Sequence, residues 1–222
     1  MDGATWQLVR ESLGPLLSGL VKGTLPLTAI TFVVGLALAL VVALMRLSGV
    51  RVLQGIARAY VSIIRGTPLL VQLFIIYSGL PSIGATIDPF PAAVIAFSLN
   101  VGGYASEIVR ASILAVPRGQ WEAASTVGMG YVTTLRRVVL PQASRVAVPP
   151  LSNTLISLLK DTSLASTIGF TELFRRAQEV AAPTYEFLVV YTVAAVYYWV
   201  VCLVLSFAQS RAESRLDRFV AA

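Results

Sequence analysis

Charged residues are scarce in four long stretches of the chain, and these stretches predict membrane-spanning helices. They cover residues 23–45, 66–87, 89–106 and 187–210. At about 1.5 Å of rise per residue, each is about long enough to cross roughly 30 Å of hydrocarbon as a helix. A fifth, less clean stretch covers residues 141–168. We therefore expect an all-α integral membrane protein with about five transmembrane helices.

Two amphipathic stretches accompany this apolar pattern. In residues 5–20, apolar side chains recur at roughly helical spacing among polar ones, which predicts that residues 1–21 form a helix in the outer interface of the membrane. Residues 171–181 place acidic and basic side chains four apart, so we expect a short helix there, after Gly169 ends the preceding one.

Composition agrees with a membrane protein and excludes several kinds of chemistry. Hydrophobic residues make up 56% of the 222 residues, and the mean hydropathy is +0.79; soluble domains have roughly 45–50% apolar residues. We expect residues 1–222 to form a single transmembrane domain. The chain has no histidine and one cysteine, Cys202. Histidine-dependent acid–base or zinc chemistry and an intrachain disulfide are therefore excluded.

The basic residues are sorted by the predicted topology rather than gathered in one patch. Eleven arginines lie near span ends on one side, against four basic residues on the other. The positive-inside rule makes the arginine-rich side cytoplasmic, which puts the N-terminus outside and the C-terminus inside. This sorting accounts for the net charge of +6 without nucleic acid binding. The eleven are Arg46, Arg51, Arg58, Arg110, Arg118, Arg136, Arg137, Arg145, Arg211, Arg215 and Arg218.

A row of polar side chains lies on one face of the third predicted span. Asn100, Tyr104 and Glu107 follow one another at spacings of four and three residues. A carboxylate at membrane depth needs a partner, and Arg65 and Arg110 are the candidates. A structural ion pair, with Arg65–Glu107 as the main candidate, is therefore favoured over contact of Glu107 with a ligand. The alternative for Arg65 is that its side chain extends to the cytoplasmic interface.

The less clean stretch carries a second polar row. Asn153, Ser157, Lys160 and Asp161 are spaced so that they share a face of a helix. The run Lys-Asp-Thr-Ser at 160–163 offers an ammonium, a carboxylate and two hydroxyls, which a zwitterion needs after it leaves water. The alternative is that Lys160 and Asp161 extend to the outer surface and only mark the helix end.

Residues 122–141 carry the most informative motif. They read EAASTVGMGYVTTLRRVVLP and fit the pattern Glu-Ala-Ala, three residues, Gly, nine residues, Ile-x-Leu-Pro, with Val138 in place of Ile. Glu-Ala-Ala before a glycine also occurs at ordinary helix ends. The fixed position of Leu140-Pro141 and the placement between two apolar segments argue against that reading. The motif resembles the cytoplasmic coupling loop of permease subunits in ATP-binding-cassette (ABC) importers.

The resemblance extends over nearly the whole chain. The strings RGTPLLVQLF, GGYASEIVRASI, VVLPQASRVAVPPLSN and LLKDTSLAS are similar to the polar amino acid branch of these permeases. Within that branch, residues 75–93 and 149–166 are most similar to L-cystine permeases. The resemblance implies L-cystine as the substrate, with arginine, histidine or glutamine as the alternatives.

The same resemblance implies a mechanism and its partners. Importers of this family work by alternating access: a soluble binding protein delivers the amino acid, a dimer of ATPase subunits closes on ATP, and the coupling loops convey that closure to two permease chains. We therefore expect a second, identical permease chain, surrounding lipid, and a multi-pass location in the bacterial cytoplasmic (inner) membrane.

Functional residues are carried over by matching position. The coupling loop covers residues 118–140, where Gly128 makes the bend and Pro141 begins the next helix without needing its missing N–H. The ATPase contact is expected at Glu122, Ala123, Ala124, Gly128, Leu140 and Pro141. The positions that match the intramembrane substrate site are Asn100, Lys160, Asp161, Thr162 and Ser163.

The chain itself is not expected to hydrolyse ATP or to bind a cofactor. A Walker A loop has a glycine before its lysine, whereas Lys22 follows Val21 and Lys160 follows Leu159. ATP and Mg²⁺ therefore belong to a separate ATPase.

Two other classes of function compete with the importer. Arg65, Glu107, Lys160 and Asp161 could form the ion path of a secondary transporter or channel, but five spans without an inverted repeat argue against it. A membrane enzyme would use Glu107 and Asp161 as acid and base, but no histidine, metal cluster or nucleophile elbow accompanies them.

Overall fold

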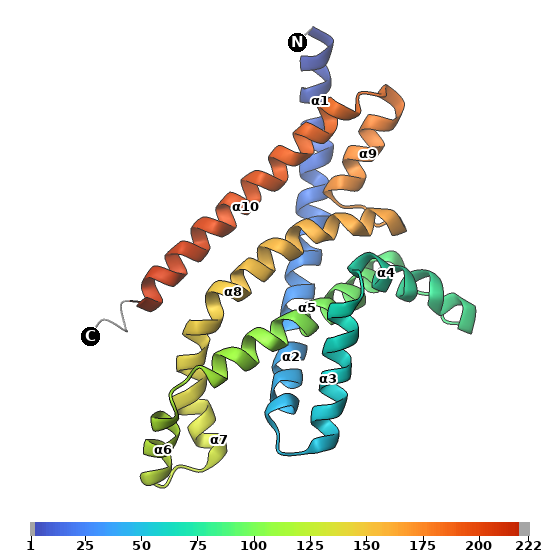
Figure 1. The fold of residues 1–222 in the computed structure, drawn as a ribbon. Helices are drawn as coiled ribbons and strands as arrows, with labels where there is room; N and C mark the ends of the chain where they lie inside the picture. The colour runs from blue at the N-terminus through green and yellow to red at the C-terminus, as the bar shows by residue number, and fades with distance from the viewer. Residues whose placement is uncertain (1–2, 218–222) are drawn as a thin grey trace.

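The computed structural model describes residues 3–217, and within them every regular element is helical (Figure 1). The α-helices are α1 (Gly3–Gly19), α2 (Leu25–Leu47), α3 (Arg51–Gly66), α4 (Leu69–Phe74), α5 (Pro89–Leu114), α6 (Arg118–Thr126), α7 (Tyr131–Thr134), α8 (Leu140–Asp161), α9 (Leu173–Thr184) and α10 (Phe187–Asp217). Helix α9 corresponds to the short helix expected over residues 171–181, and Gly169 ends the preceding helical turn with a φ of +82°.

The N-terminal part is one continuous helical stretch, Gly3–Leu47, rather than two helices separated near residue 22. A π-helical turn, Leu20–Thr24, joins α1 to α2. Pro26 lies in the first turn of α2, and the wider π turn before it leaves room for a residue without an N–H donor. The charge of Lys22 interrupts the apolar pattern of the sequence there without breaking the helix.

The second apolar stretch, residues 66–87, has a break in the helix near its beginning. Helix α3 and the helical stretch Leu69–Ile83 meet at an angle of 107°. The break falls at Thr67 and Pro68, which are both extended, because proline cannot continue the hydrogen-bonding ladder of α3 and disfavours helical geometry in the residue before it. Figure 1 shows α4 turning away from the top of α3.

Helices α2 and α5 form the central contact of the fold. A Cβ at Gly35 would lie 2.6 Å from Val101, and a Cβ at Gly102 would lie 2.7 Å from Leu38, so both glycines allow the two backbones to approach closely. Phe97 is fully buried at the centre of this contact. Helix α8 crosses α5, and α10 lies along the outer side of α8 (Figure 1).

Three helical stretches among the described residues are long and apolar enough to cross a membrane: Gly3–Leu47, Pro89–Leu114 and Phe187–Arg215. The bent pair, Arg51–Gly66 with Leu69–Ile83, adds a fourth if it forms one span. Helix α8 is not among them, since Arg145, Lys160 and Asp161 add charge to it. Each of the five expected apolar segments thus contains helix, although residues 66–87 also include the break and a non-helical end, while length and composition identify three or four spans.

Candidate coupling loop and polar cavity

The motif of residues 122–141 folds into a short helix, a tight turn and a second helix at one end of the molecule, beside the turn between α2 and α3 (Figure 1). Gly128 ends α6 with a φ of +79°. Its N–H donates to the carbonyl of Ser125, and the N–H of Met129 donates to the carbonyl of Ala124, each at 3.0 Å. This is a Schellman motif, whose left-handed position favours glycine. The expected bend at Gly128 is therefore confirmed.

One face of the loop is packed and the other is open. Ala124 is buried and Leu140 packs in a cluster around Val139, whereas Glu122, Ala123, Gly128 and Pro141 are exposed. Trp121 of α6 stacks on Tyr131 of α7, with ring centroids 5.8 Å apart. The open face also carries the apolar side chains of Val127 and Val132, which are 75% and 74% exposed. An apolar surface outside the spans is typical of a protein-binding site.

Pro141 does not stand at a free helix end. Helix α7, a π-helical turn over Leu135–Val139 and α8 form one uninterrupted helical run from Tyr131. Pro141 lies in the first turn of α8, directly after the π turn. The expectation that Pro141 begins a helix thus holds for α8 alone, because the π turn accommodates the proline within a longer run.

A polar cavity of about 430 Å³ lies where the break between α3 and α4 meets α5 and α8. Asn100 and Asp161, from two of these helices, face it from different walls, and four hydroxyl-bearing residues accompany them. Its walls are Thr67, Pro68, Leu69, Asn100, Val101, Tyr104, Asn153, Thr154, Ser157, Leu158 and Asp161. The two polar rows of the sequence therefore meet in one cavity, except for Glu107 and Lys160.

Gln72 of α4 holds the wall of this cavity in place, a role that the sequence analysis missed. Its Nε2 donates to the carbonyl of Ile64 at 2.9 Å and to the carbonyl and hydroxyl of Thr67 at 3.1 and 2.9 Å. Its Oε1 accepts a 3.1 Å hydrogen bond from Asn100. These bonds satisfy carbonyls that the break in the helix leaves open. The sequence offers one indication of this role: Gln72 is an amide in an otherwise apolar run, four residues after Pro68.

Lys160 and Asp161 line different cavities: Asp161 shares one with Asn153 and Ser157, as expected, whereas Lys160 does not. Lys160 and Ser163 line a second cavity of about 520 Å³ on the other side of α8, together with Ile156, Phe174, Ala195, Tyr198, Trp199 and Cys202. Adjacent helical residues are about 100° apart, and α8 lies between α5 and α10, so each of the two faces a different neighbour. Thr162 is fully buried, and its hydroxyl donates to the carbonyl of Leu159 at 2.7 Å.

The expected Arg65–Glu107 ion pair is wrong for this structure. The carboxylate of Glu107 binds Arg46 of α2 at 2.6 Å and Arg110 of its own helix at 3.0 Å. The guanidinium of Arg65 instead lies over the ring of Tyr104, 5.5 Å from its centroid. Arg46 reaches Glu107 because α2 packs along α5, a contact that sequence spacing does not report.

Glu172, in the loop before α9, is fully buried, although the charge pattern of residues 171–181 predicts a short amphipathic helix there. Its carboxylate accepts hydrogen bonds from the backbone N–H groups of Phe174 and Arg175 at 2.8 and 2.6 Å, which caps α9. Burial raises the pKa of Glu172, against the opposing effect of these N–H donors and of the hydroxyls of Tyr198 and Thr24. The carboxyl joins α9 to both the N-terminal helix and α10.

Comparison with known proteins gives consistent matches over the chain. A family model described as "Binding-protein-dependent transport system inner membrane component" matches residues 33–218. The L-cystine transport system permease protein TcyB of Bacillus subtilis is 59% identical over 217 residues, which cover 97% of this chain and 93% of TcyB. The arginine transport system permease protein ArtQ of the same organism is 40% identical over 194 residues, or 87% of this chain and 89% of ArtQ.

Solved structures share the fold. The crystal structure of an amino acid ABC transporter with histidines superposes with a TM-score of 0.89 at 38% identity, covering 97% of this chain and all of that one. The MetNI methionine ABC transporter in an inward-facing conformation gives a TM-score of 0.72 at 21% identity over 97% of this chain and 99% of that one, a likeness of fold alone.

Proposed function

The chain belongs to the family of binding-protein-dependent transport system inner membrane components, and from this we infer that it is the permease subunit of an ATP-driven importer of L-cystine. The observation that supports L-cystine as the substrate is the 59% identity to an L-cystine permease over 97% of the chain. Relatives named for arginine and glutamine are 40% and 37% identical. Arginine, glutamine and histidine are therefore the alternative substrates.

The substrate binds in the polar cavity. Its volume of about 430 Å³ falls within the usual range for small-molecule sites, roughly 300–1,000 Å³. The carboxylate of Asp161 faces the ammonium group of the amino acid, and Asn100 offers its amide carbonyl while its N–H is held by Gln72. Lys160 and Ser163 lie at the same end of α8 and line the second cavity, and Thr162 beside them is fully buried.

The coupling loop over residues 118–140 docks on the ATPase. The exposed Glu122, Ala123 and Gly128 lie on the open face of the loop beside the exposed apolar side chains of Val127 and Val132. Leu140 and Pro141 connect this face to α8, so a displacement of the loop moves the wall that carries Asp161. Closure of the ATPase is thereby converted into a change of the polar cavity.

The protein spans the bacterial inner membrane five times. Helix α8 is a span that composition does not identify. Its charged Asp161 is tolerated at membrane depth because it faces the polar cavity rather than lipid. The N-terminus is outside and the C-terminus inside, as the distribution of arginines indicates. Residues 1–222 form one transmembrane domain, in which residues 1–21 contact the outer interface.

The working complex contains several partners. They are a soluble substrate-binding protein, a dimer of ATPase subunits that binds ATP and Mg²⁺, and a second copy of this chain. Family membership supports the ATPase and the binding protein. This chain contributes no catalytic residue and no cofactor site. The polar wall of the cavity is open in the single chain, and a second copy would separate it from lipid.

Uptake of labelled L-cystine into proteoliposomes tests the function. The vesicles hold this chain with its ATPase and binding protein, and arginine, histidine and glutamine compete. ATP-dependent, cystine-selective uptake is expected, and a vesicle set with a hydrolysis-deficient ATPase is the control. Selective uptake of another amino acid would exclude L-cystine but keep the importer. Conduction without ATP would instead indicate a channel or a secondary transporter.

A further inference from the structure

The polar cavity is unbalanced in charge. Its wall contains one carboxylate, that of Asp161, and no cationic side chain. An amino acid carries both an ammonium and a carboxylate group at neutral pH. If the ammonium faces Asp161, the carboxylate of the substrate still needs a charged partner, because an unpaired ion is strongly disfavoured once it leaves water.

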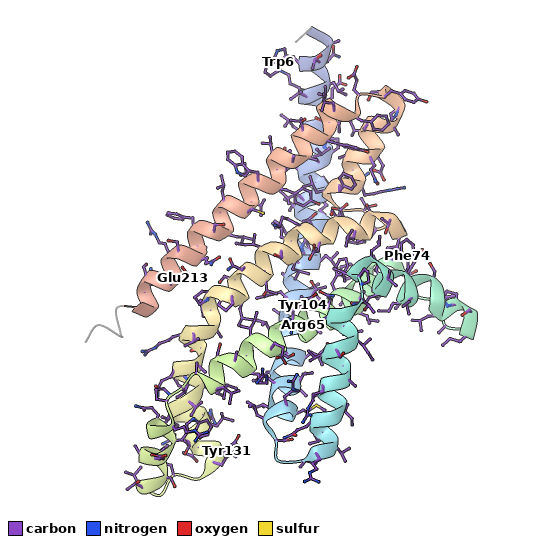
Figure 2. The ribbon with its side chains drawn as sticks, in the orientation of Figure 1. Trp6, Arg65, Phe74, Tyr104, Tyr131 and Glu213 are labelled. Atoms are coloured by element: carbon purple, nitrogen blue, oxygen red, sulfur yellow. The ribbon has the colours of Figure 1, made fainter. Side chains whose placement is uncertain are left out.

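Two cations adjoin the cavity in sequence, and the structure distinguishes between them. Lys160 lies on α8, directly before the wall residue Asp161, but its side chain lines the second cavity on the other side of α8. Arg65 precedes the wall residue Thr67 by two positions, at the end of α3. Its guanidinium lies 5.5 Å from the ring centroid of Tyr104, and Tyr104 is itself a wall residue. Figure 2 shows Arg65 and Tyr104 together beside α3 and α5.

The guanidinium of Arg65 forms no ion pair with an acid among residues 3–215, whose side chains the structure describes. Glu107, the nearest candidate in the polar row of α5, is bound by Arg46 and Arg110 instead. The guanidinium of Arg65 therefore lies at the edge of the cavity against the ring of Tyr104, and it interacts with Glu107 electrostatically without an ion pair. Its planar N–H donors match a carboxylate in a two-bond geometry, which a lysine does not provide.

We propose that Arg65 binds a carboxylate group of the transported amino acid while Asp161 faces the ammonium group of the same end, with the Tyr104 ring holding the guanidinium at the cavity edge. This inference rests on the proposed function. L-Cystine presents one such ammonium and carboxylate at each end of a disulfide, so one of its ends occupies this pair of charges. Arg65 is then a specificity-determining residue for substrates that carry an α-carboxylate.

A direct binding measurement distinguishes the contributions of the ammonium and carboxylate groups of the ligand. The purified complex of this chain with its ATPase, without binding protein, is titrated with L-cystine, with cystamine, which lacks both carboxylates, and with 3,3′-dithiodipropionate, which lacks both ammonium groups. Arg65→Gln should weaken L-cystine and the diacid about tenfold or more and leave cystamine within about twofold. Asp161→Asn should show the reverse preference between the two analogues. Arg65→Lys should recover part of the affinity for L-cystine.

Arg58→Gln is the matched control, because Arg58 lies on the same helix, is exposed and donates a hydrogen bond to Gln54. It should leave all three affinities unchanged. Equal weakening of cystamine and L-cystine by Arg65→Gln, or no weakening of either, would overturn the carboxylate contact while the wild-type complex still binds L-cystine. A wild-type complex that binds no L-cystine would refute the proposed substrate and this inference together.

Discussion

The phenol of Tyr198 on α10 donates a 2.9 Å hydrogen bond to the buried carboxylate of Glu172, in the loop before α9. The hydroxyl of Thr24, from the N-terminal helical stretch, approaches the same carboxylate at 3.4 Å and accepts from the N–H of Leu173 at 3.1 Å. Three segments far apart in sequence thus meet at one acid. A Cβ at Gly23 would lie 2.4 Å from the carbonyl of Thr171, so the helix can approach this loop only with glycine there.

The buried acid predicts a pH-dependent stability. The pKa of Glu172 is raised in the folded protein, so folding favours its protonated form. The contribution of Glu172 is therefore greatest below the pKa of the unfolded chain and falls as pH rises through the interval up to the folded pKa. The melting temperature of wild type minus that of Glu172→Gln should decrease over this interval and then level off. Glu186→Gln, at an exposed acid, is the control and should show no such trend; a difference that rises with pH would contradict the prediction.

Removal of the amide of Gln72 should destabilise the broken helix. Gln72→Leu keeps the apolar contacts of α4 but leaves the carbonyls of Ile64 and Thr67 without their donor, at about 1–3 kcal/mol for each buried group. We expect a melting temperature lower by several degrees and weaker binding of L-cystine, because Asn100 also loses its partner. Gln7→Leu, at an exposed glutamine, should change neither quantity. Unchanged melting of Gln72→Leu would show that water replaces the amide.

Helix α5 should tolerate no side chain at Gly103. An added Cβ would lie 2.5 Å from Cγ2 of Ile64 on α3, so Gly103→Ala should cost about 1–3 kcal/mol through overpacking. Ile64→Ala removes the clashing atom, and the double variant should lose less stability than the sum of the two single variants. Gly55→Ala on α3 meets open space and should be neutral or slightly stabilising. Additive losses in the double variant would place the strain elsewhere.

The left-handed turn of the coupling loop should matter for transport. Gly128→Ala forces a side chain into a positive φ at a cost of about 1 kcal/mol, and Gly128→Asp adds charge to the open face. Both should reduce co-purification of the ATPase and ATP-driven uptake by severalfold or more. Gly119→Ala, within α6 and with open space around it, should be far milder. Full uptake by Gly128→Asp would argue against this face as the docking site.

Because two sides of α8 line different cavities, substitutions of the neighbouring residues Lys160 and Asp161 should have different effects. Asp161→Asn removes the one carboxylate of the polar cavity and should weaken substrate binding about tenfold or more. Lys160→Ala changes the second cavity and should leave the affinity within a few-fold. Equilibrium binding to the complex of permease and ATPase checks both. A loss in Lys160→Ala as large as in Asp161→Asn would mean that α8 rotates to bring the ammonium into the polar cavity.

The apolar pattern of the sequence and the glycines at helix ends predicted much of the fold. The apolar stretches are helical, and the left-handed glycines at 128 and 169 end helices where the sequence indicated. Lys22 was misread as a boundary, because a charge interrupts an apolar pattern without breaking the hydrogen bonds of a helix. Composition identified the segment of α8 only as a less clean apolar stretch, because it contains charged residues, two of which line cavities.

The site was predictable only as far as helical spacing reaches. Asn100 and Asp161 line one cavity, as the family resemblance implied, and Tyr104, one helical turn from Asn100, lines it as well. The partner of Glu107 was not predictable, since Arg46 is 61 residues away in sequence and reaches it through the packing of α2 on α5. The separation of Lys160 from Asp161 likewise depends on which helices cover the two sides of α8.

Because α8 is the wall shared by both cavities, a rotation of that helix that widens one cavity changes the other as well. Cys202, the single cysteine of the chain, lies in the lining of the second cavity and is partly exposed there. The chain therefore carries a thiol of its own across α8 from the polar cavity. The rate at which a small alkylating reagent reaches that thiol reports, without any engineered label, how α8 moves between the steps of a transport cycle.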